Sequence, residues 1–110
     1  MEHVSFLLRI DPKDQEEYFK RHEQVYPDLE KAFGEVGIHR YHIYYYEGTL
    51  FAYMAVENYE KAMAVLDGHP ANLKWQEFMS DMLLPWENGQ NAKVIREAYR
   101  YVNAAEEETK

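Results

Sequence analysis

The longest hydrophobic pattern in the chain covers residues 16–36 and has the period of an amphipathic helix. Its apolar positions recur every three or four residues, at Tyr18, Val25, Tyr26, Leu29, Ala32, Phe33 and Val36. His22 interrupts the stripe four residues after Tyr18, on the same helix face. Pro27 has no N–H to donate to a carbonyl one turn earlier, so we expect the helix to kink or restart there. The pattern therefore predicts a titratable group on an inward face, beside a phenol.

Strand patterns occur over residues 4–10, 38–46 and 50–56. In the second stretch two sets of side chains alternate between opposite faces: Tyr41, Ile43 and Tyr45 against His42, Tyr44 and Tyr46. Since both sets contain aromatic residues, both faces should be at least partly covered. Residues 47–49 include Gly48 and predict a hairpin, so the second and third strands should pair antiparallel.

The helical and extended signals continue in the second half of the chain. Asn58 should cap a helix over residues 59–66, and a further helix is expected over residues 72–84. That last helix places Trp75, Phe78, Met79 and Met82 on one face. Residues 85–91 form a predicted loop, residues 94–102 a last strand, and residues 104–110 a solvated acidic tail.

The resulting order of elements, β-α-β-β-α-β, is that of the ferredoxin-like split βαβ fold in the α+β class. We predict one domain over residues 1–103, with both helical layers on one face of a four-stranded antiparallel sheet. Something must cover the aromatic residues on the other face. A homodimer packed sheet to sheet, or closed into a dimeric α/β barrel, would do so.

The amino-acid composition limits the classes of partner and of chemistry that are expected. The 110 residues include 20 acidic and 12 basic side chains, for a net charge of −8, which disfavours nucleic acid and anionic membranes as partners. Cysteine is absent, which excludes disulfides, thiol nucleophiles and Cys-ligated metals. The N-terminal residues do not resemble a signal peptide, and no apolar run approaches the roughly 20 residues that span a bilayer. We therefore expect a cytoplasmic protein.

The candidate chemistry is proton transfer by a histidine. No glycine-rich phosphate loop, Gly-x-Ser-x-Gly elbow or His-Glu-x-x-His motif is present. His39 and His42 would point to opposite strand faces, so no metal site is expected. A histidine titrates near neutrality, and tyrosine and tryptophan rings stack on sugars, so His22 with its aromatic neighbours suits a small neutral polyol. A core histidine satisfied by Tyr18 remains the alternative.

Three segments resemble the L-rhamnose mutarotase family, and the similarity extends from about residue 6 to residue 101. The matching residues are Glu17, Tyr18, Arg21, His22, Tyr26, Pro27, Asp28 and Leu29, then Gly37, Tyr41 and Ile43, then His69, Pro70, Lys74, Trp75, Phe78, Met79, Asp81 and Met82. The resemblance implies a ferredoxin-like homodimer without cofactor or metal that interconverts the α and β anomers of a deoxyhexose. It implies His22 as proton donor and Tyr18, Tyr41 and Trp75 as sugar-binding residues.

Two departures from the family pattern fall on the expected sugar pocket. Gln76 stands where the family has the second of two tryptophans, and residues 85–89 replace an Asn-Pro-Asp-Asn loop. We therefore add Gln76 to the expected substrate-binding residues and leave open which sugar binds. Trp86 is a candidate to replace the missing aromatic surface, and Trp75 could be either pocket wall or plain core. The general base also stays open: a water or a neighbouring sugar hydroxyl would serve.

Two other classes of function suit the same fold. One is a haem-binding or cofactor-free monooxygenase, in which His22 could be an axial ligand of the haem. A non-catalytic sugar-binding module would bind the sugar without changing its rate of anomer exchange.

Overall fold

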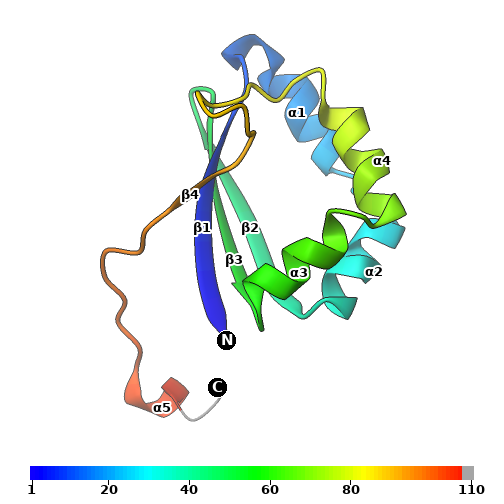
Figure 1. Cartoon of the computed structure of the whole chain (residues 1–110). Coiled ribbons are helices and arrows are strands. Elements are labelled where there is room, and N and C mark those ends of the chain that lie inside the picture. Colours follow the sequence, from blue (N-terminus) through cyan, green and yellow to red (C-terminus); the bar gives the residue numbers. More distant parts are fainter. Residues whose placement is uncertain (108–110) are drawn as a thin grey trace.

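The computed structural model describes residues 1–107 and has a single four-stranded antiparallel sheet with four helices on one face (Figure 1). The strand order is β2-β3-β1-β4, as the ferredoxin-like prediction requires. The strands are β1 (Glu2–Arg9), β2 (Ile38–Tyr46), β3 (Thr49–Val56) and β4 (Lys93–Ile95). The helices are α1 (Gln15–His22), α2 (Pro27–Glu35), α3 (Tyr59–Leu66), α4 (Pro70–Met79) and the short α5 (Ala104–Glu107), with a 3-10 turn at Pro12–Asp14.

The first helical stretch restarts at the proline, as predicted. The α1 helix ends at His22, and Pro27 occupies the first turn of α2, where its missing N–H costs nothing. Gly37 follows α2 with a φ of 86°, the left-handed conformation that glycine adopts most readily. The break after His22 means that the histidine lies at a helix end, close to the free carbonyl groups of the last turn.

A two-residue turn at Glu47 and Gly48 connects β2 to β3 and confirms the predicted hairpin. Both residues have positive φ, 43° and 90°, which is the combination found in type I′ hairpin turns. A Cβ on Gly48 would lie 2.8 Å from the carbonyl oxygen of Ile10, so the turn packs directly against the end of β1. The hairpin thereby fixes which residues of β2 face the helices.

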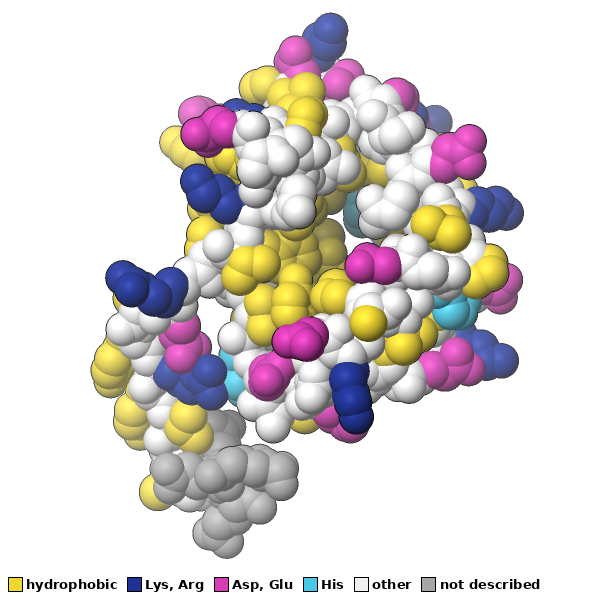
Figure 2. All heavy atoms as spheres, in the orientation of Figure 1, with side chains coloured by type: hydrophobic (Ala, Val, Ile, Leu, Met, Phe, Trp, Pro, Cys, Tyr) yellow, Lys and Arg dark blue, Asp and Glu magenta, His cyan; other side chains and the backbone are white. Residues whose placement is uncertain are grey.

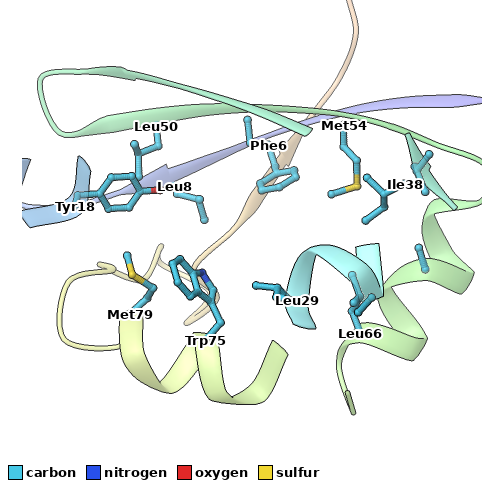
Figure 3. Packing of buried hydrophobic residues seen from close by; sticks show 14 of the residues in the cluster. Phe6, Leu8, Tyr18, Leu29, Ile38, Leu50, Met54, Leu66, Trp75 and Met79 are labelled. Atoms are coloured by element: carbon cyan, nitrogen blue, oxygen red, sulfur yellow. The ribbon is translucent and has the colours of Figure 1, made fainter. Parts of the chain in front are cut away.

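The hydrophobic core lies between the sheet and α1–α4 (Figure 3). Phe6 and Leu8 enter from β1, and Leu29 enters from α2. Tyr18 and Trp75 belong to the same buried cluster, with 4% and 8% of their surface exposed. The core is therefore continuous with residues expected at the site.

The last predicted helix begins earlier and ends earlier than expected. It starts at Pro70, with the His69 ring nitrogen Nδ1 accepting from the Ala71 N–H at 3.1 Å, and it ends at Met79 instead of residue 84. The chain leaves the helix to pair with the residues at the end of β1: Leu83 forms a β-bridge with Ile10, and Leu84 donates its N–H to the Arg9 carbonyl at 2.9 Å. Phe78, expected on the buried face, is 41% exposed.

The last strand is much shorter than predicted. The β4 strand pairs with only Ser5, Phe6 and Leu7 of β1, and the chain then runs away from the sheet on the side opposite the helices (Figure 1). Residues 96–103 are exposed, with Tyr99 at 81% and Tyr101 at 71%. The prediction came from β-branched and aromatic residues, but a strand also needs a neighbouring strand to pair with, and residues 1–107 offer none beyond Ile95. Of the acidic tail, residues 108–110 lie outside the described residues, and the domain boundary at residue 103 stays a prediction.

The outer face of the sheet is bare in a single chain, and the predicted cover by a second copy stays a prediction. Tyr44 and Tyr46 of β2 are 62% and 66% exposed, and Phe51 of β3 is 43% exposed. Beside them, His3 Nδ1 and the Tyr53 hydroxyl are 2.6 Å apart and hydrogen-bonded. Within residues 1–107, no segment buries Tyr44, Tyr46 or Phe51.

Within residues 1–107, no helix combines the length and apolar character needed to span a bilayer.

Candidate active site

A cavity of about 1180 Å³ lies between the sheet and the helices. Figure 2 shows it as a hollow near the middle of the molecule with hydrophobic side chains on its walls. All five predicted site residues line it: Tyr18, His22, Tyr41, Trp75 and Gln76. The fold thus brings together α1, β2 and α4, which are far apart in the sequence. The cavity exceeds the usual range of about 300–1,000 Å³ for small-molecule pockets, so it has room for a monosaccharide.

His22 is held at the end of α1 by its own helix. Its Nδ1 lies 3.0 Å from the carbonyl oxygen of Tyr18, one turn earlier. A carbonyl can only accept, so Nδ1 carries a proton and donates it, and in the neutral ring Nε2 keeps its lone pair. The ring also stacks on Tyr18 with centroids 4.2 Å apart and planes at 24°. The half-buried imidazole is therefore fixed in orientation and in tautomer.

Burial lowers the pKa of His22 below its ordinary value of 6.5, and the hydrogen bond to the Tyr18 carbonyl offsets this only in part. Desolvation disfavours the charged imidazolium, which accounts for the direction. Near neutral pH the resting side chain is consequently the neutral imidazole, with Nε2 ready to accept a proton.

Trp75 is both a core residue and part of the cavity wall, the two roles between which the sequence did not decide. It is 8% exposed and belongs to the buried cluster, yet it also lines the cavity. Its ring lies edge-on to His22 with centroids 5.3 Å apart, and edge-on to Tyr26 at 5.0 Å. Trp75 therefore both fills the core and restricts the space in which His22 can move.

Protonated phenols supply hydrogen-bond donors to the cavity. Burial raises the pKa of Tyr18 and of Tyr41 well above the ordinary 10.0, so both remain neutral across the physiological range. Negative charge on Tyr18 or on Tyr59 would raise the pKa of Tyr41 further, so Tyr41 lies within electrostatic range of both. Sequence analysis missed Tyr59. The spacing of Tyr59, Met63 and Leu66 along one face of the predicted helix could have indicated that it points inward.

Arg21 ties the end of α1 to the end of α4. It pairs with Glu17 at 2.9 Å and makes a two-point contact with Asp81 at 2.9 and 3.2 Å. It also donates to the Phe78 carbonyl at 2.7 Å. Hydrogen bonding to this guanidinium holds the pKa of Asp81 below its ordinary value. Because Arg21 precedes His22, this set of bonds fixes the histidine's backbone relative to α4.

Gln76 and Trp86 have different surroundings. Gln76 is exposed at the cavity rim, where its amide donates to Asn72 Oδ1 at 3.5 Å. Trp86 is absent from the cavity wall: its Nε1 donates to the Leu7 carbonyl at 3.1 Å, and the Arg9 guanidinium covers its ring at 4.1 Å. Trp86 therefore does not replace the aromatic surface missing at Gln76. It anchors the 85–91 loop to β1.

Comparisons of the sequence with known proteins match a single family. A family model described as L-rhamnose mutarotase matches residues 3–102. A protein named L-rhamnose mutarotase from Sinorhizobium fredii is 37% identical over 86 residues, which are 76% of this chain and 81% of that protein.

Solved structures match the fold. An L-rhamnose mutarotase from Formosa agariphila superposes with a TM-score of 0.80 at 23% identity, covering 93% of this chain and 100% of that one. A tetracenomycin F2 cyclase from Streptomyces glaucescens reaches a TM-score of 0.65 at 17% identity, covering 94% and 99%. A polyketide cyclase shares the architecture, so the fold alone does not identify the reaction.

Proposed function

Because this chain belongs to the L-rhamnose mutarotase family, it is a sugar mutarotase, an isomerase that interconverts α and β anomers, and we propose that the sugar ring opens and closes beside His22. The proposed substrate is L-rhamnose or a closely related deoxyhexose. One observation carries the assignment of the site: His22 lines the cavity with Nδ1 bonded to its own helix, which leaves Nε2 to exchange a proton with a ligand. Saturation-transfer NMR between the two anomeric protons, run across a panel of hexoses, tests it.

The reaction needs one proton moved between two oxygens on the same carbon. In our proposal the neutral Nε2 accepts the proton of the anomeric hydroxyl, O1. The C1–O5 bond breaks, O1 becomes the aldehyde oxygen, and the imidazolium delivers the proton to O5. After rotation about C1–C2, the reverse steps close the ring on the other face of the aldehyde. A positioned acid/base group contributes about 10²–10⁴-fold.

This scheme extends the role expected from the sequence. The resemblance implied His22 as the proton donor and left the base unidentified. A neutral resting imidazole with a fixed Nδ1–H can serve as base first and acid second. O1 and O5 are both bonded to C1, so a single nitrogen can reach both. No second catalytic group is then required.

The other site residues would bind the sugar. Tyr18 and Tyr41 can donate hydrogen bonds to sugar hydroxyls, and Trp75 supplies apolar surface for the C–H faces. Gln76, at the rim, would contact a hydroxyl through its amide. The cavity wall and the raised pKa values of both phenols support these roles.

The rate of anomer exchange should depend on pH through His22. The neutral ring is the active form, and its pKa is lowered from 6.5. Activity should therefore be lost as the pH falls through this lowered pKa and should stay level at higher pH. The phenols do not add a second decline, because Tyr18 and Tyr41 titrate above 10.0. Exchange rates measured from about pH 5 to about pH 9, with circular dichroism to exclude unfolding, check this. A rate that declines as the pH rises through neutrality would instead identify the imidazolium as the resting form.

We also propose that the protein is a homodimer joined through the outer face of the sheet. Tyr44, Tyr46 and Phe51 expose large apolar surfaces there. Residues 96–103 run off the same side of the sheet and expose Tyr99 and Tyr101 (Figure 1). Exposed apolar area of this kind usually marks an interface.

A cytoplasmic location stays a prediction.

Phe51→Glu should convert the dimer to monomers, because β3 is a central strand and a charge there would be buried without a partner. Sedimentation equilibrium at micromolar concentration measures the result. Val65→Glu on α3 is the control: that residue is 53% exposed on the helical side and should leave the dimer intact. A wild-type protein that sediments as a 13.2 kDa monomer would refute the homodimer.

The family match favours a mutarotase over the monooxygenase and the non-catalytic sugar-binding module. No contact within residues 1–107 favours either alternative.

A further inference from the structure

One face of α3 forms a wall of the cavity. Tyr59, Met63, Leu66 and Asp67 all line the cavity, and their spacing of four, three and one residues puts them on one side of the helix. In Figure 3, Leu66 and Tyr18 lie on opposite sides of Trp75. The α3 wall is therefore at the far end of the cavity from Tyr18 and the imidazole stacked on it.

The polar groups of the cavity continue from His22 toward this wall. Tyr18 stacks on His22, and charges on Tyr18 and Tyr59 both raise the pKa of Tyr41. The Asp67 carboxylate in turn adds to the effect of burial in raising the pKa of Tyr59. Each group thus lies within electrostatic range of the next, from the imidazole to the carboxylate. The hydroxyl donors of the three tyrosines and the carboxylate acceptor of Asp67 belong to residues that line the same cavity.

The position of Asp67 is unfavourable for local structure. It is the C-cap of α3, where the negative end of the helix dipole disfavours an acidic side chain. Its carboxylate makes no hydrogen bond or ion pair with any of residues 1–105, and the side chain is exposed at the cavity rim. Neither capping nor pairing explains an acid here. Residues that break a local rule in this way are often found at functional sites.

Nearby contacts hold the wall in place. The Asn72 amide donates to the Leu66 carbonyl at 2.9 Å, so the end of α3 is bonded to α4, which also carries Trp75. Tyr59 begins α3, and its own N–H donates to the Glu2 carboxylate at 2.7 Å. Both ends of α3 are therefore anchored, and the side chains on its inner face have a fixed position relative to His22.

We propose that Tyr59 and Asp67 bind the ring hydroxyls farthest from the anomeric carbon, those on C3 and C4, and so select among sugars. This rests on the proposed function, which places C1 and O5 at His22. A pyranose oriented in this way points the opposite edge of its ring at α3. A carboxylate is a strong acceptor for hydroxyl donors, and a site built to bind a hydroxyl discriminates against sugars that lack it.

Asp67→Asn tests the proposal, with L-rhamnose and its 3-deoxy and 4-deoxy analogues as probes. For L-rhamnose we expect the Kd to rise about tenfold, or about 1.4 kcal/mol, with the exchange rate at saturating sugar unchanged. For the analogue that lacks the bound hydroxyl, Asp67→Asn and wild type should have equal Kd values. Tyr59→Phe should show the same pattern with a smaller rise. The melting temperature should hold or rise, because the substitution removes an acid from a helix C-terminus.

Glu60→Gln is the matched control: it removes one charge from the same helix at a residue outside the cavity wall, and its Kd should equal that of wild type. Equal Kd values for Asp67→Asn and wild type with L-rhamnose would overturn the proposal. So would an equal rise in Kd for all three sugars, which indicates a general loss of charge and not a hydroxyl contact. Failure of the proposed function looks different, because wild type would then exchange the anomers of none of these sugars.

Discussion

His22→Ala should lower the rate of anomer exchange by roughly 100-fold or more while sugar still binds. The variant removes the imidazole that lies edge-on to Trp75 and has its Nδ1 fixed by the Tyr18 carbonyl. It should fold, since His22 is half-buried and its loss leaves the aliphatic core untouched. Saturation-transfer NMR gives the exchange rate, and titration of the same sample with sugar gives the Kd.

His69→Asn is a suitable control for His22→Ala. His69 caps α4 through its ring nitrogen, and asparagine is itself a good N-cap, so fold and exchange rate should both be retained. If His22→Ala unfolds the protein, the histidine is a structural core residue. If the variant folds, binds sugar and exchanges anomers at the wild-type rate, His22 does not carry the proton.

Trp75→Ala should have the largest effect on stability among the site residues. Truncating a buried tryptophan typically costs about 3–5 kcal/mol, and Trp75 is 8% exposed. The edge-on contacts to His22 and Tyr26 would be lost with the ring. Urea unfolding should therefore show a large loss of stability, accompanied by weaker sugar binding.

Two further variants separate the core role of Trp75 from its sugar-binding role. Trp75→Phe keeps an aromatic ring, so it should weaken sugar binding more than it lowers the melting temperature. Met82→Ala removes a side chain that is 3% exposed and lies outside the cavity wall, so it should lower stability without changing the Kd. A Trp75→Phe variant with reduced stability and unchanged affinity would mean that Trp75 is only a core residue.

Local signals determined the first half of the fold. The restart at Pro27 follows from a missing N–H, and the hairpin at Gly48 follows from a turn that needs positive φ. Both depend on residues close together in the sequence. The inward position of His22 follows from the helical period alone, and so does its place near Tyr18. The structure added the tautomer, because that depends on which atom of Tyr18 accepts the hydrogen bond.

In the second half, the helix over residues 59–66 and its Asn58 cap were confirmed, whereas long-range contacts decided the later elements, where the predictions were wrong. Nothing near residue 80 indicates that α4 must end there; the Leu84 N–H bonds to Arg9, some 75 positions earlier. Residues 94–102 contain β-branched and aromatic residues that favour a strand, but among residues 1–107 only Val94 and Ile95 of this stretch have a pairing partner, since β4 ends at Ile95. Trp86 looked like pocket surface by composition, and its hydrogen bond to Leu7 places it outside the cavity.

The residues of the candidate site were likewise predicted in part from the sequence and found in part only in the structure. The sequence, with its family resemblance, identified the residues around His22, because they lie on a helix stripe and in motifs with fixed spacing. It did not identify Tyr59 and Asp67, because neither a tyrosine on a helix face nor an acid at a helix end shows from the sequence that its side chain meets the cavity. They become candidates only when α3 packs against the sheet and turns their face toward the cavity. Periodicity determines which side of a helix is buried, whereas the packing of helices on the sheet determines which buried side faces the sugar.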